Sequence, residues 1–220
     1  MNIFFLDYDI RKCAQYHCDK HVIKMILEYA QILCTSFRSV ILSISSMKIF
    51  EDIEIYRSTH IKHPCVLWAM SSFKHWFYLW SLCALLDREY LYRYKSNISC
   101  AEFDDFVDNW DFDIINGNFL SNLNDFDVQR NLIANLSLNY NDSHKSFCVV
   151  ARLANKIVSS EDIFMLFISS FQNVEFVHPP QAMPDIYRSD DCVESYRLYY
   201  KMDKVSFAKW INRDIPKWMD

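Results

Sequence analysis

The sequence has almost no glycine and little proline. Gly117 is its single glycine, and only five prolines occur in 220 residues. The phosphate loops of kinases and P-loop NTPases, the dinucleotide turn of Rossmann enzymes and the nucleophile elbow of α/β-hydrolases each need two or more glycines. These enzyme classes are therefore excluded. A β-rich fold is also disfavoured, because its tight turns depend on glycine and proline, whereas helices can be joined by Asn, Asp and Ser loops.

The sequence also lacks paired cysteine motifs, a secretory leader and an apolar run of membrane length. The first residues, MNIFFLDYDI, have no basic region followed by a long apolar one. The longest nearly apolar run, residues 76–86, is about half of a membrane span. We therefore expect an intracellular protein with no membrane partner. Its cysteines lie mostly in apolar runs, which favours free thiols over disulfides: Cys13, Cys18, Cys34, Cys65, Cys83, Cys100, Cys148 and Cys192.

What the sequence does contain is enough apolar material for one filled core. Apolar residues make up 51% of the chain and aromatic residues 16%, with no internal repeat and no Pro/Ser-rich linker. We predict a single all-α domain over 1–220, a helical bundle with long Asn/Asp-rich connections. Helices are expected after a short extended start at 3–6, over 10–37, 64–95, 143–158, 160–172 and 190–210. Asp9 is expected to cap the first helix and Pro64 to begin the second.

Negative charge is concentrated in one part of the chain. The formal net charge is -5, and residues 101–130 hold only Arg130 against eight acidic residues. This segment belongs to a loop-rich acidic insertion expected over 96–141. Because the rest of the chain is nearly balanced, a positive cleft elsewhere remains possible, and so does a nucleic-acid or nucleotide partner.

A polar stripe runs along the first predicted helix. At 100° per residue, its members fall within about 80° of one another: His17, His21, Lys24, Glu28 and Gln31. The remaining circumference is apolar, which indicates a helix buried on most sides. Such a stripe faces a cleft or a partner, or it is simply the solvent face, with Lys24 and Glu28 as an ordinary i,i+4 ion pair.

The same helix carries a possible metal pair. His17 and His21 have the i,i+4 spacing that can hold one ion. Cys13 lies two turns before His21, about 12 Å along the axis, so these two cannot share a metal. A third ligand would have to come from His63 or Cys65. Neither an HExxH motif nor a deaminase motif is present, so we predict no metal and no cofactor and keep a metal-dependent hydrolase as an alternative.

Two further segments have features of a binding surface. Pro64 at a first helical position places His63 at a helix N-terminus, which suits a bound anion, although His63 can also be a simple cap. Trp68 follows in an aromatic helix that belongs either to the core or to a base-stacking surface. The last predicted helix alternates rings and cations, which is typical of nucleic-acid contacts: Tyr196, Arg197, Tyr200 and Lys204.

Amine chemistry is the best supported covalent chemistry. Lys24 has apolar neighbours that can desolvate it, and the α-amine of Met1 is close in sequence to the first helix. Either amine can form a Schiff base with a carbonyl or an opened sugar, while Glu28 assists the proton transfers. Gln31, one turn further on, and His63 would contact the substrate, and His21 would assist in catalysis.

The runs CDKHVIKMILEYAQIL, HPC…W and MPD…VESYRLYYK…FAKW…RDIPKW resemble a group of mostly uncharacterised phage and large-virus proteins. The segment from Asp19 to Glu28 is also similar, more distantly, to the pyrimidine-dimer DNA glycosylase of T-even phages. That resemblance implies a small all-α enzyme with an N-terminal amine nucleophile and an essential helix glutamate. Glu28 takes the place of this glutamate, and His21 that of a histidine of the same helix. Asn2 is a large residue, so Met1 is expected to stay in place.

These observations predict a viral protein that processes nucleic acid or a nucleotide, most concretely a DNA glycosylase/lyase-like enzyme of DNA repair. Its catalytic residues would be Met1, His21, Lys24 and Glu28. The alternatives are a non-enzymatic protein that binds a nucleotide or docks a partner through 101–130, and the metal-dependent hydrolase through His17 and His21. The sequence predicts no oligomeric state.

Overall fold

The computed structural model of the chain describes residues 1–41, 53–95, 130–131, 133–134, 142–172 and 174–220. These residues form an all-α fold and contain no strand, as predicted. None of their helices is both long and apolar enough to cross a membrane. The acidic segment 101–129, like most of the expected insertion, lies outside the described residues. The α-helices are α1 Ile10–Tyr16, α2 Asp19–Ile41, α3 Pro64–Ser71, α4 Phe73–Tyr94, α8 Lys145–Ile157, α9 Glu161–Ser169 and α10 Cys192–Tyr199.

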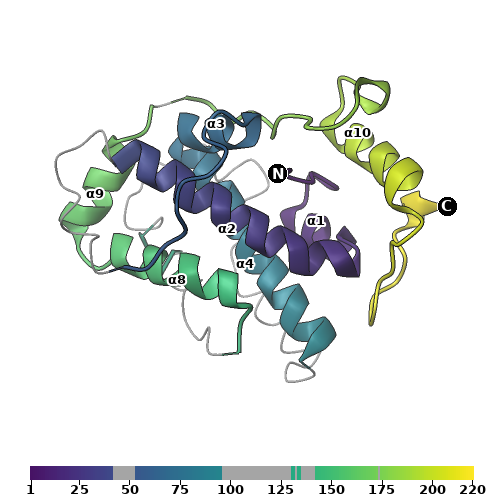
Figure 1. The fold of residues 1–220 in the computed structure, drawn as a ribbon, viewed down its shortest axis with the longest axis horizontal. Coiled ribbons are helices and arrows are strands. Elements are labelled where there is room, and N and C mark those ends of the chain that lie inside the picture. The colour runs from purple at the N-terminus through teal and green to yellow at the C-terminus, as the bar shows by residue number, and fades with distance from the viewer. Residues whose placement is uncertain (42–52, 96–129, 132, 135–141, 173) are drawn as a thin grey trace.

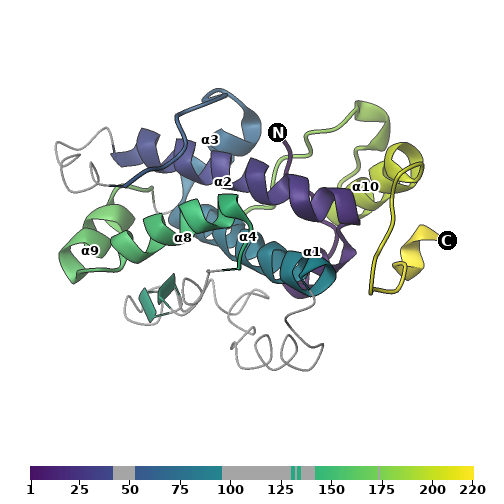
Figure 2. The ribbon, with the colours of Figure 1, turned by 60° about the horizontal axis from the view of Figure 1, so that its bottom comes forward.

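The core forms where α2 packs against α4. Helices α3 and α8 also contact α2, while α9 and α10 lie at opposite ends of the molecule (Figure 1, Figure 2). Helix α4 is buried on nearly all sides, and Trp76 and Trp80 have no exposed surface. A helix that is apolar all round belongs in the interior. The described cysteines are free thiols, all buried except the half-buried Cys148.

The helix expected over 10–37 is interrupted after two turns. Asp9 caps its start as predicted, but a continuous helix was wrong, since the backbone of His17 is extended (φ −61°, ψ 128°). The reason lies far along the chain. The buried guanidinium of Arg93 donates to the carbonyl oxygens of Gln15 and His17, each at 2.8 Å. These carbonyls are therefore satisfied without another helical turn.

The helix expected over 64–95 is also divided. Pro64 begins α3 as predicted, and His63 is its N-cap, which was one of the two roles expected of it. The break comes at Ser72, whose backbone is extended and whose Oγ caps the start of α4. The same hydroxyl donates to the carbonyl oxygen of Val174 at 3.1 Å. A contact with a distant segment thus sets the end of α3, which local sequence could not predict.

The helix expected over 190–210 is much shorter. Helix α10 gives way after two turns to a π-helical turn, Tyr200–Lys204, and the chain then leaves the helical path. Asp19 holds the segment that follows, because its carboxylate accepts the N–H of Ile211 at 3.0 Å. Its own N–H donates to the carbonyl of Lys209 at 2.8 Å. By contrast, the helices expected over 143–158 and 160–172 are confirmed as α8 and α9.

The N-terminal segment is buried without being helical or part of a sheet. Residues 3–6 have almost no exposed surface. The N–H of Phe4 donates to the hydroxyl of Tyr29 on α2 at 3.2 Å, and Arg197 of α10 donates to the carbonyl of Leu6 at 2.8 Å. Side chains from both ends of the chain therefore hold this segment, and with it the position of the α-amine.

Candidate functional site

Glu28 gathers three nitrogen groups around one carboxylate. Its Oε1 lies 3.2 Å from the Nζ of Lys24, one helical turn earlier. Its Oε2 accepts the backbone N–H of Asn2 at 3.0 Å and lies 4.0 Å from the α-amine of Met1. The side chain of Glu28 is 15% exposed, whereas that of Lys24 is 64% exposed. The carboxylate is thus largely shielded from solvent but not fully buried.

Asn2 fixes the amine in place. Its side-chain amide donates to the carbonyl oxygen of Ala182 at 2.9 Å. Its side-chain oxygen accepts the hydroxyl of Tyr196 at 2.7 Å, and that hydroxyl also lies 2.9 Å from the carbonyl oxygen of Pro180. Tyr196 itself is fully buried on α10. The position of the first residues therefore depends on the loop before α10 and on α10 itself.

The N-terminus of α3 lies within electrostatic reach of this carboxylate. Burial lowers the pKa of His63, the α-amine and His60 lower it further, and Glu28 opposes them. Burial raises the pKa of the Cys65 thiol to about 12, and the same amine and carboxylate act on it. His63 Nδ1 accepts the N–H of Cys65 at 3.2 Å. The structure thus brings Met1, Lys24 and Glu28 together, with His63 close enough for their charges to act on it.

His21 lies in an aromatic cluster next to this site, away from solvent. Its ring is 4% exposed and stacks on Phe4, with centroids 4.5 Å apart. Its Nδ1 hydrogen-bonds to the hydroxyl of Tyr200, which is also fully buried. Burial lowers the pKa of His21 to about 3, helped by His17, Lys24 and Lys204. His21 is therefore neutral at pH 7 and has no described contact with Glu28.

The predicted polar stripe is not the exposed face of α2. Lys20, Ile23, Lys24 and Leu27 are the exposed residues at that end of the helix. His21 is buried on the other side, and the break after α1 removes His17 from the helix altogether. The exposed edge of α2 thus includes two large apolar residues, and Lys24 on it forms the i,i+4 pair with Glu28 that the alternative interpretation supposed.

His17 is committed to protein contacts. Its Nδ1 lies 2.7 Å from the carbonyl oxygen of Cys13 and its Nε2 3.2 Å from the hydroxyl of Tyr29. Burial lowers its pKa to about 4, and the charge of Arg93 acts in the same direction. In the part of the chain that the structure describes, no group of three His, Cys, Asp or Glu residues is placed to hold a metal ion. The metal alternative therefore lacks a third ligand there.

The other predicted binding residues are dispersed. The indole of Trp68 donates to the carbonyl of Val177 at 2.9 Å and stacks on His75, so Trp68 is part of the core. Arg197 pairs with Asp7 at 2.6 Å. Their predicted roles in binding stay predictions. Four predicted binding residues remain. Gln31 is half-buried on α2, Tyr196 and Tyr200 are fully buried, and the Nζ of Lys204 is 2.9 Å from the hydroxyl of Tyr199.

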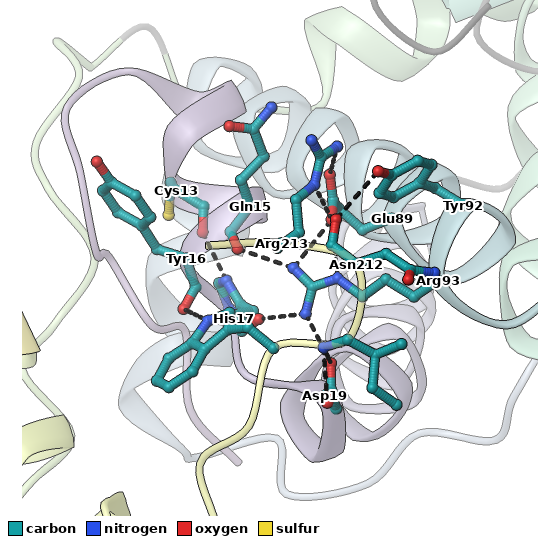
Figure 3. A network of polar contacts seen from close by, with 12 residues as sticks. Cys13, Gln15, Tyr16, His17, Asp19, Glu89, Tyr92, Arg93, Asn212 and Arg213 are labelled. Carbon is teal, nitrogen blue, oxygen red and sulfur yellow. Dashed lines mark hydrogen bonds and ion pairs between the residues drawn. The ribbon is translucent and has the colours of Figure 1, made fainter. Parts of the chain in front are cut away.

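A second charged cluster, which the sequence did not suggest, joins α4 to the C-terminal segment (Figure 3). Arg93 pairs with Glu89 at 2.9 Å and with Asp19 at 3.1 Å. Arg213 pairs with the other oxygen of Glu89 at 2.8 Å. Arg93 and Glu89 are fully buried. Glu89 and Arg93 share the i,i+4 spacing of Lys24 and Glu28, so spacing alone could not have separated the two clusters.

A cavity of about 770 Å³ opens beside this second cluster. Its lining comes from α1, α4 and the C-terminal segment: Gln15, Tyr16, Tyr92, Asn212, Arg213, Asp214, Ile215, Pro216 and Lys217. The cavity is separate in its lining from Glu28 and combines phenol rings with charged groups. It is therefore a second place where a polar ligand can be held.

Comparison with protein-family models, with curated proteins and with solved structures gave no match for this chain.

Proposed function

We propose that this chain is a glycosylase/lyase-like enzyme that acts on nucleic acid through an amine nucleophile. The observation that carries the proposal is the α-amine of Met1, 4.0 Å from Glu28 Oε2, with the N–H of Asn2 on the same oxygen. An amine that forms a Schiff base needs a neighbouring group to exchange protons. Glu28 is that neighbour, and it is the residue to which the resemblance to the phage glycosylase points.

The reaction needs no group beyond the amine, the carboxylate and water. The Met1 nitrogen attacks C1′ of an opened sugar, and the carbonyl oxygen leaves as water to give a protonated imine. Glu28 then takes a proton from C2′, the electrons move to expel the 3′ phosphate, and the strand is cut. Hydrolysis of the imine returns the amine. The negative charge of Glu28 also stabilises the positive charge on the imine nitrogen.

The other members of the site support these two groups. Lys24 binds the second oxygen of Glu28 and, at 64% exposure, is the competing nucleophile. His63, whose lowered pKa keeps it neutral at pH 7, can hydrogen-bond to the sugar or its phosphate. His21 is a positioning residue in this scheme, because it contacts Tyr200 and Phe4 and not the carboxylate.

Borohydride trapping on a single-stranded oligonucleotide with one abasic site tests the proposal. Reduction of the imine links protein and DNA covalently, and peptide mapping then identifies the amine. We expect the adduct on the peptide that contains Met1, and we expect a chain acetylated at its α-amine to give none. An adduct on Lys24 would exclude Met1 as the nucleophile. Absence of any adduct, with the protein folded, would overturn the proposal.

A second candidate function is ligand binding without catalysis. The observation that favours it is the cavity of about 770 Å³ beside Arg213 and Lys217, which is large enough for a nucleotide. Equilibrium dialysis with a nucleoside triphosphate would test it, with Lys217→Ala as the variant. Binding that Lys217→Ala weakens, in a protein that traps no abasic DNA, would favour this function over the first.

A further inference from the structure

Lysine ammonium groups from α2 and from the π-helical turn cover the faces of aromatic rings. The Nζ of Lys204 lies 4.1 Å from the ring centroid of Tyr199 and 2.9 Å from its hydroxyl. The Nζ of Lys20 lies 4.9 Å from the ring centroid of Phe207. These lysines come from opposite ends of the sequence, yet each is placed over an aromatic ring.

The rings form one continuous cluster with a buried centre and a more open edge. The ring of Phe4 stacks on those of His21 and Tyr199, with centroids 4.5 Å and 6.1 Å away. His21 meets Phe207 edge to face, with centroids 5.6 Å apart. Phe4 and His21 are buried, whereas Tyr199 and Phe207 are half-buried. Tyr199 and Phe207 therefore keep part of their surface exposed while the buried centre holds them in place.

The open edge carries positive charge on a chain whose net charge is -5. Among the described residues, neither Lys20 nor Lys204 forms an ion pair with a carboxylate. Asp203, adjacent to Lys204 in sequence, accepts the hydroxyl of Tyr187 at 2.6 Å instead. His21 contacts both Tyr200 of the π-helical turn and Phe207, the ring under Lys20, so α2 and the segment that begins with the π-helical turn meet at this cluster.

These features together fit one class of ligand. Cations alone would attract any anion, but half-buried rings combined with lysines are typical of proteins that stack the bases of unpaired strands and contact their phosphates. A duplex hides its base faces in its own stack. Stacking on Phe207 would tolerate any base, because every base has a flat face and Phe207 has no polar atom for reading a base edge.

We infer that the lysine–aromatic cluster of Lys20, Lys204, Tyr199 and Phe207 binds unpaired nucleotides next to the reacting sugar. Its position beside the reaction rests on the proposed function: Lys20 lies one turn before Lys24 on α2, and Lys24 pairs with Glu28. Phe4 of the cluster also follows Asn2, whose N–H binds Glu28, by two residues. The enzyme therefore takes single-stranded or locally unpaired nucleic acid in preference to an intact duplex.

Fluorescence anisotropy with a labelled oligothymidylate of about ten nucleotides tests this inference. We expect Phe207→Ala and Phe207→Leu to weaken binding about tenfold, because neither residue offers a stacking face, and Phe207→Tyr to retain it. Lys204→Ala should reduce the slope of log K against log salt by about 0.7. Lys145→Ala, an exposed lysine at the start of α8, removes the same charge elsewhere and should leave the slope unchanged.

Three probes distinguish the outcomes. The same sequence annealed to its complement should bind more weakly, and polyglutamate should not compete at equal charge. Equal binding of duplex, or full competition by polyglutamate, would overturn the inference, and so would tight oligothymidylate binding by Phe207→Leu. Because binding is measured without an abasic site, intact binding with no borohydride adduct would count against the proposed function alone. Trapping with no preference for the single strand would count against the inference alone.

Discussion

Glu28 and Glu89 each lie four residues from a basic side chain with which they pair, but their surroundings are opposite. Both oxygens of Glu89 are bound by guanidinium groups, from Arg93 and Arg213, and its side chain is fully buried. Glu28 faces an exposed lysine, a backbone N–H and an amine 4.0 Å away. A fully paired, buried carboxylate fixes the chain around it, because breaking the pair leaves an uncompensated charge. A partly exposed carboxylate that lies 4.0 Å from an amine can still exchange protons.

The largest effect is expected from Glu28→Gln. The amide keeps the shape of the carboxylate but cannot take a proton, so the single-turnover rate of cleavage at an abasic site should fall by about 10²–10⁴. Substrate affinity should change little. The matched control is Glu175→Gln, since Glu175 also pairs with a lysine, Lys74, but lies on the surface. An unchanged rate in Glu28→Gln would remove Glu28 from the mechanism.

The next largest effect is expected on folding from Arg93→Ala. The substitution leaves the buried Glu89 with Arg213 as its remaining partner, and it removes the donor to the carbonyl oxygens of Gln15 and His17. The free energy of unfolding should therefore fall by about 3–5 kcal/mol. Urea denaturation measures this. Arg188→Ala, which breaks the exposed pair with Asp185, should cost less than about 1 kcal/mol. If the two variants lose similar stability, the contrast between buried and exposed clusters is wrong.

A smaller effect is expected from pH, through the neutral histidine beside Arg93. Burial lowers the pKa of His17 to about 4 from its ordinary 6.5, so the unfolded chain binds a proton more readily. Its contribution to stability is therefore complete above pH 6.5 and is lost as the pH falls towards 4. Burial raises the pKa of Asp87 to about 6, which acts in the opposite direction.

The difference between the wild type and His17→Gln isolates this contribution. Denaturation above pH 6.5 and at several pH values between 6.5 and 4 should show the free energies of unfolding of the two proteins converging as the pH falls. Parallel curves across the window would mean that His17 does not titrate in the way its burial implies.

The smallest effect is expected from Lys24→Ala. An i,i+4 pair with an exposed lysine contributes a few tenths of a kcal/mol, so the free energy of unfolding should change by less than about 0.5 kcal/mol. Borohydride adducts should still form on Met1, since Lys24 is not the proposed nucleophile. Loss of the adduct in this variant, with folding intact, would transfer the amine role to Lys24.

Local signals in the sequence were sufficient for the capped starts of α1 and α3 but not for the breaks inside the long helices that were expected. Asp9 and Pro64 were predicted correctly, because a cap depends on the residues that follow it directly. The breaks at His17 and Ser72 depend on Arg93 and on the carbonyl of Val174, which only the folded chain brings near. Tertiary contacts therefore decided where these helices stop.

The candidate site could be predicted in part for the same reason. The pairing of Lys24 with Glu28 follows from helical spacing. The placement of the α-amine does not, because Asn2 is held by Ala182 and Tyr196. His21 was assigned to the exposed stripe because spacing gives its angle on the helix but not what covers it.

The hydrogen bonds that hold the Asn2 side chain also have a consequence for biosynthesis. Asn2 and its partners Ala182 and Tyr196 are 180 and 194 residues apart in sequence. During translation Asn2 is made long before either partner, and contacts of such long range form late in folding. The hydrogen bonds of the Asn2 side chain to Ala182 and Tyr196 therefore form only once residue 196 has left the ribosome. Until then, the nascent chain lacks the contacts that hold its first residues in place.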